Sequence, residues 1–138
     1  MYVGRSGPEF ETEVGQGTVT ALSVADAKVR WQVALGVSRF QTDEDPPFVL
    51  QPEVSALVAD GATLYVGGTF TTIAGGDRMH AAALDSASGK VLPWHPRFTG
   101  VDQRVGSIAV SSGAVTLGGF FQVALPDWQI DLAQFARR

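Results

Sequence analysis

Apolar and glycine positions recur along this chain at a fixed spacing of 51 residues. The stretch VSALVADGATLYVGGTFTTIAGGDRMHAAAL, residues 54–84, aligns without a gap with VGSIAVSSGAVTLGGFFQVALPDWQIDLAQF, residues 105–135. The identical pairs are Val54 and Val105, Gly67 and Gly118, Gly68 and Gly119, Phe70 and Phe121, and Ala82 and Ala133. A fixed period of this length is typical of repeat architectures, in which one strand scaffold is copied.

The first of these two copies predicts four short antiparallel strands. Alternation and turn residues place them at Val54–Ala59, Thr63–Gly68, Met79–Leu84 and Lys90–Trp94. The dipeptide Asp60-Gly61 is a strong hairpin signal, whereas residues 75–77 predict a looser connection. Apolar residues fall on both parities, as Tyr65 and Val66 do, which indicates a sheet covered on both faces.

An earlier, looser copy precedes it and completes the predicted organisation. Its matches at shifts of 62 or 63 residues are Tyr2-Val3-Gly4 with Tyr65-Val66-Gly67, Ala21-Leu22 with Ala83-Leu84, Lys28-Val29 with Lys90-Val91, and Trp31 with Trp94. We therefore expect a partial blade at 1–35, an insertion loop at 36–53, a full blade at 54–104 and a partial blade at 105–138. The predicted fold is all-β: a partial β-propeller with about two and a half blades of four antiparallel strands. Because a closed propeller has about four to eight blades, the expected partners are the remaining blades of the same polypeptide or self-assembly.

Composition narrows the function classes. With 45% apolar and 17% charged residues, the 138-residue chain is of globular type. A net charge of −4 with scattered basic residues argues against a nucleic-acid partner. The chain has no cysteine, which excludes a disulfide framework, a thiolate zinc site and a cysteine nucleophile. No run approaches the roughly 18 apolar residues of a membrane span, and no secretory signal is visible at the N-terminus, MYVGRSGPEF.

The central copy resembles the bacterial delta-60-type β-propeller repeat. The resemblance rests on VSALVADGATLYVGGTFTTIAGG, AAALD and GKVLPWHP, within residues 54–96. That family's pattern has an apolar strand, a turn, the sequence L-Y-V-G-G-x-F, and an alanine-leucine strand ending in aspartate. It implies a large secreted or surface bacterial protein with a scaffold or binding role, and therefore an extracellular or cell-surface location. The third copy departs by placing Pro126-Asp127 where the central copy has Gly75-Gly76.

A second resemblance gives an alternative. ALDSASGKVLPW at 83–94, and more loosely ALSVADAKVRWQ at 21–32, are similar to the repeat of quinoprotein-type propellers. In that repeat the tryptophans dock adjacent blades. The resemblance implies a segment of a propeller oxidoreductase with pyrroloquinoline quinone, although the same repeat also builds non-catalytic scaffolds.

The repeated glycines and tryptophans have a functional and a structural interpretation. Gly67-Gly68 and its repeat partner could cradle a phosphate only if they opened a helix, and here a further strand follows, so a bulge or a close approach between blades is favoured. Trp31 and Trp94 recur in phase, which favours packing wedges between sheets over a ligand platform. Trp128 has no repeat partner and is the freer candidate for a contact.

The histidines and Asp85 form no pattern that predicts a catalytic or metal site. His80 and His95 are the only histidines and do not recur, so a metal role is disfavoured. Asp85, just before Ser86–Gly89, is explained as a turn former. We expect no catalytic, cofactor-binding or metal-binding residue and no cofactor; the expected function is a non-catalytic scaffold or binding segment.

The insertion QVALGVSRFQTDEDPPFVLQPE is the strongest sequence candidate for a specific function. It follows Trp31 and belongs to one copy only. It combines acidic and apolar residues around Pro46-Pro47, and loops on rigid scaffolds are where binding residues concentrate. Candidate ligands are a protein or a carbohydrate, and a cation is disfavoured because the loop lacks the glycine and spacing of a known calcium loop. The candidate partner-binding residues are Phe40, Asp43, Glu44, Asp45 and Phe48, with Trp128. The alternative is a tolerated insertion without function.

Replacement of Arg39–Pro52 by a short glycine-serine link tests this candidate. Lengthening a surface loop costs only about 0.6 kcal/mol per doubling, so we expect the melting temperature to stay almost unchanged while partner or cation binding weakens. Loss of the cooperative melting transition would show that the segment belongs to the core. Unchanged binding would show that it is a tolerated insertion.

Overall fold

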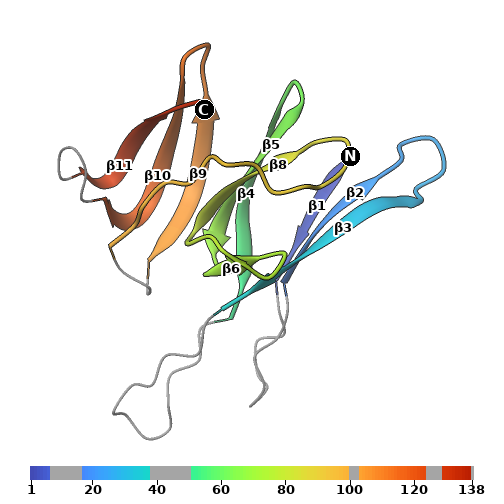
Figure 1. Cartoon of the computed structure of the whole chain (residues 1–138), viewed down its shortest axis with the longest axis horizontal. Helices are drawn as coiled ribbons and strands as arrows, with labels where there is room; N and C mark the ends of the chain where they lie inside the picture. Colours follow the sequence, from blue (N-terminus) through green and yellow to red (C-terminus); the bar gives the residue numbers. More distant parts are fainter. Residues whose placement is uncertain (7–16, 38–50, 100–102, 124–128, 138) are drawn as a thin grey trace, which may run out of the picture.

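The chain folds, in a computed structural model, into three small antiparallel sheets that stand side by side (Figure 1). The structure describes residues 1–6, 17–37, 51–99, 103–123 and 129–137. No helix occurs in these ranges. The expected all-β class is confirmed.

Most strands pair with strands near them in sequence, but β6 and β7 join the first sheet from beyond the first two strands of the central sheet. The first sheet has the order β1 (Tyr2–Arg5), β2 (Gly17–Leu22), β3 (Val29–Gly36), β6 (Thr72–Ile73) and β7 (Gly76–Asp77). The central sheet has the order β4 (Glu53–Asp60), β5 (Thr63–Thr69) and β8 (Ala81–Asp85). The third sheet has the order β11 (Gln129–Ala136), β10 (Ala114–Val123) and β9 (Arg104–Val110).

The strands expected in the central copy differ from the observed ones in three places. β8 begins two residues later than expected because His80 has φ 58°, which no extended strand accepts. The fourth strand is reduced to a bridge between Leu84 and Val91, and the proline at 93 lacks the N–H that a longer ladder needs. The connection at 75–77 forms part of the β6–β7 hairpin, which pairs with the end of β3 in the neighbouring sheet.

The central sheet is buried on both faces. Leu64 and Val66 of β5 are 0% exposed and belong to an apolar cluster shared with the first sheet. Tyr65, between them, points to the opposite face and joins a second cluster shared with the third sheet. The occurrence of apolar residues on both parities therefore correctly predicted a sheet without a wet face.

Glycines sit at the bulges of the central and third sheets. The pairing of β4 with β5 shifts register between Val54 and Ala56, opposite Gly68. A Cβ on Gly68 would overlap the backbone carbonyl oxygen of Glu53. Gly119 has the same role in the third sheet, where a Cβ would lie 2.8 Å from the backbone nitrogen of Gly106. Both glycines are thus required by the backbone geometry, as the structural interpretation of the pair predicted.

Substitution of Gly68 by alanine tests this requirement. We expect the free energy of unfolding to fall by roughly 1–3 kcal/mol, because the bulge must open to admit the methyl group. Urea denaturation gives the value. Gly113→Ala is the matched control, since a Cβ there meets nothing within 4 Å. Equal, near-neutral effects of the two substitutions would contradict the steric role of Gly68.

Candidate functional site

The residues that the sequence put forward for partner binding lie outside the described residues. The structure describes the chain up to residue 37 and again from residue 51, and it omits 124–128. The candidates Phe40, Asp43, Glu44, Asp45, Phe48 and Trp128 fall within these gaps, so their role stays a prediction.

Both junctions between sheets place a valine over a glycine. At the first junction the valine is Val54 of β4, whose side chain fills the space that a Cβ on Gly4 would need. At the second junction a Cβ on Gly67 would lie 2.6 Å from Cγ1 of Val105 in β9. The two valines are repeat partners, and so are the two glycines. Each sheet thus approaches the next through the same pair of residue types.

Both junctions also use a tryptophan in the same way. The indole Nε1 of Trp31 donates to the carbonyl of Ser86 at 3.2 Å, across the first junction. The indole Nε1 of Trp94 donates to the carbonyl of Ala136 at 3.0 Å, across the second. Each ring packs against the tyrosine of its own sheet, with centroid distances of 5.8 Å to Tyr2 and 5.2 Å to Tyr65. The interpretation of these tryptophans as packing wedges is confirmed.

Both junctions also share a backbone contact. In each, a residue that follows the tryptophan in the chain forms a hydrogen bond with the next repeat. The backbone N–H of Thr71 donates to the carbonyl of Gly36 at 2.9 Å. At the second junction the backbone N–H of Thr99 donates to the carbonyl of Gln122 at 3.1 Å. Thr71, which lies between β5 and β6, and Gln122 of β10 are repeat partners, although Thr71 donates its hydrogen bond and Gln122 accepts one. The chain therefore links each sheet to its successor by a short strand pairing.

The two histidines differ from metal ligands in their surroundings. His80 is 0% exposed, and its ring lies edge-on to Phe98 with centroids 5.4 Å apart. Burial, followed by the nearby Arg78 and Arg97, lowers the pKa of His95, which favours its neutral form. Within the described ranges no group of three or more His, Asp or Glu side chains could hold a metal ion.

Asp85 acts as a turn former. Its Oδ1 accepts hydrogen bonds from the backbone N–H of Ser88 at 2.8 Å and from the Ser88 hydroxyl at 2.6 Å. These bonds, the hydroxyl one first, lower the pKa of Asp85 because they stabilise the ionised carboxylate. Gly89 closes the same turn with φ 75°. The interpretation of Asp85 as a turn residue is confirmed.

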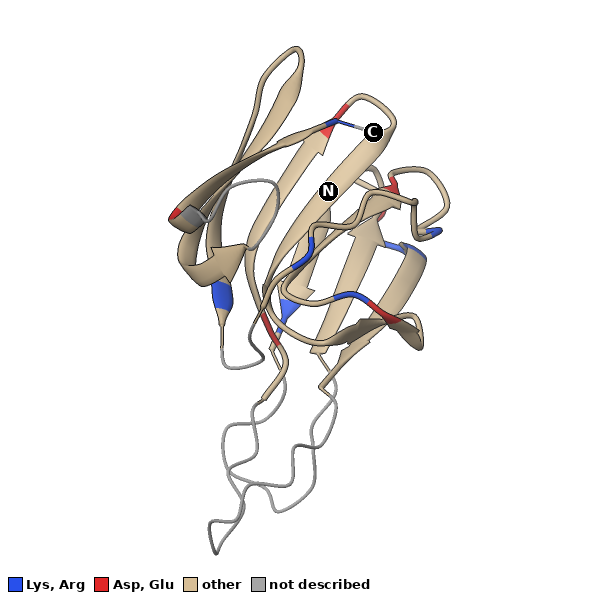
Figure 2. Cartoon of the chain, turned by 60° about the vertical axis from the view of Figure 1, so that its left-hand side comes forward, with Lys and Arg blue, Asp and Glu red and all other residues tan. Residues whose placement is uncertain are grey.

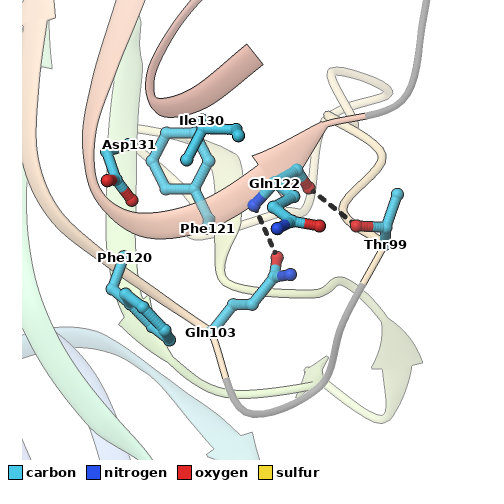
Figure 3. Close-up of a pocket in the computed structure, with 7 residues that line it drawn as sticks. All are labelled: Thr99, Gln103, Phe120, Phe121, Gln122, Ile130 and Asp131. Atoms are coloured by element: carbon cyan, nitrogen blue, oxygen red, sulfur yellow. Dashed lines mark hydrogen bonds between the residues drawn. The ribbon is translucent and has the colours of Figure 1, made fainter. Parts of the chain in front are cut away.

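A recess of about 380 Å³ lies beside the third sheet (Figure 3). Its volume lies within the range of small-molecule sites, about 300–1,000 Å³. The recess combines aromatic, aliphatic, amide, hydroxyl and carboxylate groups from Thr99, Gln103, Phe120, Phe121, Gln122, Ile130 and Asp131.

Hydrogen bonds fix the polar wall of the recess. Oε1 of Gln103, a residue only 7% exposed, accepts from the backbone N–H of Gln122 at 3.2 Å. The hydroxyl of Thr99 donates to the Gln122 carbonyl at 3.2 Å, as the dashed lines in Figure 3 show. The pairing of β10 with β11 shifts register between Gly118 and Gln122, next to the recess. The backbone of this wall is therefore held by side chains on both sides.

The accessible wall of the recess is amphipathic. Phe120 is 66% exposed and Ile130 is 60% exposed, so both offer apolar surface to a ligand. Asp131 adds a carboxylate from a residue with φ 62°. Such a surface suits a ligand with an apolar face and hydrogen-bonding groups, and among the described residues that line it no nucleophile is paired with a base.

Sequence reasoning missed this recess, although the sequence carries a signal for it. At three of its positions the third copy departs from the central copy: Thr69 becomes Phe120, Met79 becomes Ile130 and His80 becomes Asp131. His80 is buried in the central copy, whereas Asp131 is exposed. The positions where two aligned copies differ in polarity or size would have indicated the site.

Charge is dispersed over the described residues. Figure 2 shows basic and acidic positions interspersed along the ribbon rather than gathered on one side. One ion pair, Arg137 with Asp60, joins the third sheet to the central one. None of the described segments is a helix long and apolar enough to cross a membrane.

Comparison with known proteins assigns the chain to no family. A scan against protein-family models, a search of curated proteins and a search of solved structures return no match to the chain. The resemblances to the delta-60-type and quinoprotein-type repeats therefore stay predictions.

Truncation of the tryptophan wedges tests the junctions. Trp94 is 6% exposed, so Trp94→Ala should lower the free energy of unfolding by about 3–5 kcal/mol. Trp31 is only half-buried, and Trp31→Ala should cost less. Chemical denaturation of both variants gives the comparison. A cost for Trp94→Ala below that for Trp31→Ala would contradict the role of Trp94 as the main wedge of its junction.

Proposed function

We propose that this chain is a non-catalytic scaffold and binding segment of a β-propeller, in which each sheet is one blade. The observation that carries the proposal is the equivalence of its two junctions. Both use a valine over a glycine, an indole N–H on a carbonyl of the next sheet, and a crossing segment. Stacks of units that contact only their neighbours are typical of repeat scaffolds.

The repeated residues are occupied by packing, which leaves binding to the residues that do not repeat. Gly67, Gly68 and Trp94 all serve the sheets and their junctions. The recess beside the third sheet has exposed apolar side chains, Phe120 and Ile130, together with the carboxylate of Asp131. It supports a protein or carbohydrate ligand with an apolar face. A secreted or surface bacterial protein as the source is supported by the delta-60-type resemblance alone.

One observation favours the quinoprotein-type alternative. Trp31 and Trp94 each dock onto the following sheet, which is the role of the tryptophans in that repeat. Catalysis would further require polar and charged groups that converge from several blades. In the described part of the chain, the recess brings together a single carboxylate, that of Asp131, and two amides. The scaffold proposal is therefore preferred, and the oxidoreductase alternative stays a prediction.

Duplication of one repeat tests the scaffold. A second copy of 54–104 is inserted directly after Arg104, so that its Val54 takes the place of Val105 over Gly67. Because the new junction uses contacts that already exist, we expect the longer chain to fold and to melt cooperatively at no lower temperature. Circular dichroism should show strand content that grows with length.

The control carries the same 51 residues in scrambled order at the same place. It should unfold or aggregate, since the insertion separates the central sheet from the third sheet without offering a junction. If the native duplication destabilises the chain as much as the scrambled one, the proposed repeat scaffold is wrong.

A further inference from the structure

The exposed large apolar side chains of the described residues gather on the outer faces of the first and third sheets. The first sheet carries Met1, Val3 and Val29, the third sheet carries Phe120, Ile130 and Leu132, and Val24 lies in a turn. We name the outer face of the first sheet, made by Met1, Val3, Leu22 and Val29, the leading face. The outer face of the third sheet, made by Gly118, Phe120, Ile130 and Leu132, is named the trailing face.

The geometry of β1 and its neighbours assigns the leading face. Val3 points away from the central sheet, because Tyr2 and Gly4 on either side of it both contact that sheet. Leu22 shares the face of Val3, since it alternates with the inward Ala21 and is paired with Val29. The backbones of Met1 and Leu22 exchange hydrogen bonds of 2.8 and 3.1 Å, which puts Met1 on the same face.

The repeat partners of the leading face are junction residues. At shifts of 62 or 63 positions, Met1, Val3, Leu22 and Val29 correspond to Leu64, Val66, Leu84 and Val91. All four of these partners pack in the apolar cluster between the first and central sheets. Leu84 and Val91 are bridged just as Leu22 and Val29 are paired. The leading face of the first sheet therefore corresponds to the face of the central sheet that packs against the first sheet. On the leading face, however, Met1, Val3 and Val29 are exposed.

The trailing face corresponds to the face of the central sheet that packs against the third sheet. Leu132 is paired with Gly118 and alternates with the buried Ala133, so it points away from the central sheet. The central-sheet partners of Gly118, Ile130 and Leu132 are Gly67, Met79 and Ala81. Gly67 contacts Val105, while Met79 and Ala81 pack in the cluster shared with the third sheet. The trailing face thus matches a surface that is covered elsewhere in the molecule.

Arg5 shows that the first sheet departs from the repeat at β1, the outermost strand among its described ones. It corresponds to Gly68 at a shift of 63 positions. Gly68 is required because a Cβ there would overlap the carbonyl of Glu53 in the bulged first strand of the central sheet. The Cβ of Arg5 excludes a strand bonded to β1 with the same bulge. The leading face is therefore built by β1, β2 and β3 without such a strand.

We propose that the trailing face of one molecule docks on the leading face of a second copy of this chain, through apolar faces equivalent to those that meet at the two junctions within the chain. The inference rests on the proposed repeat scaffold and names its partner. Because the two faces differ, the contact is head to tail and generates either a closed ring or a filament. Two copies with three sheets each bring six, within the range of about four to eight blades of closed propellers.

The test blocks each face separately with a charge. Val3 is 42% exposed and Leu132 is 64% exposed, so Val3→Glu and Leu132→Glu should both leave the fold intact, which circular dichroism and melting verify. We expect the unchanged chain to sediment above the monomer in analytical ultracentrifugation. Each variant alone should associate at least about tenfold more weakly, because a carboxylate is then buried in the junction. Val24→Glu, at an 85% exposed turn position outside both faces, is the control and should assemble normally.

Mixing the two variants identifies the head-to-tail geometry. Val3→Glu keeps an intact trailing face and Leu132→Glu keeps an intact leading face, so an equimolar mixture should form a heterodimer that neither variant forms alone. Association blocked by Leu132→Glu only would mean that two trailing faces meet, and it would overturn the proposal. A monomeric unchanged chain would also overturn it, while the duplication experiment would still decide the scaffold by itself.

Discussion

The close approach of a valine to a bare glycine backbone holds this structure together. Sheets that pack face to face are ordinarily separated by about 10 Å of interdigitated side chains. At Gly4 and Gly67 one of the two layers is missing, and the side chains of Val54 and Val105 occupy its place. The tryptophan wedges then reach far enough for an indole N–H to meet a carbonyl of the next sheet. Larger residues at these glycines would separate the sheets and break the hydrogen bond as well.

This constraint explains which features of the fold the sequence could predict. The glycines, the tryptophans and the two covered faces of the central sheet all belong to contacts that recur, so alignment of the chain with itself reveals them. The position of Gly68 is an example, because its bulge depends only on the local pairing of β4 with β5. Residues in repeated contacts must fit the same space in each copy, so the same residue types recur. Their pattern can therefore be recognised in the sequence.

Features that depend on one particular neighbour could not be predicted in this way. The β6–β7 hairpin pairs with β3, a strand of another sheet, and nothing local in residues 72–77 specifies that partner. The late start of β8 follows from the positive φ of His80, a conformation that its sequence does not announce. The recess arises where the third copy departs from the central one, so a search for similarity between copies passes over Phe120 and Asp131.

The recess and the proposed docking surface share residues, which relates the two proposals. In the central sheet Met79 and His80 are covered by the next sheet and by Phe98. Their partners in the third sheet, Ile130 and Asp131, line the open recess. A second copy on the trailing face would contact Ile130 and Phe120, the same apolar side chains that a ligand in the recess would use. Under the two proposals, ligand binding and assembly would therefore compete for one surface, and in a closed ring the non-repeated loops would be the places left for a ligand.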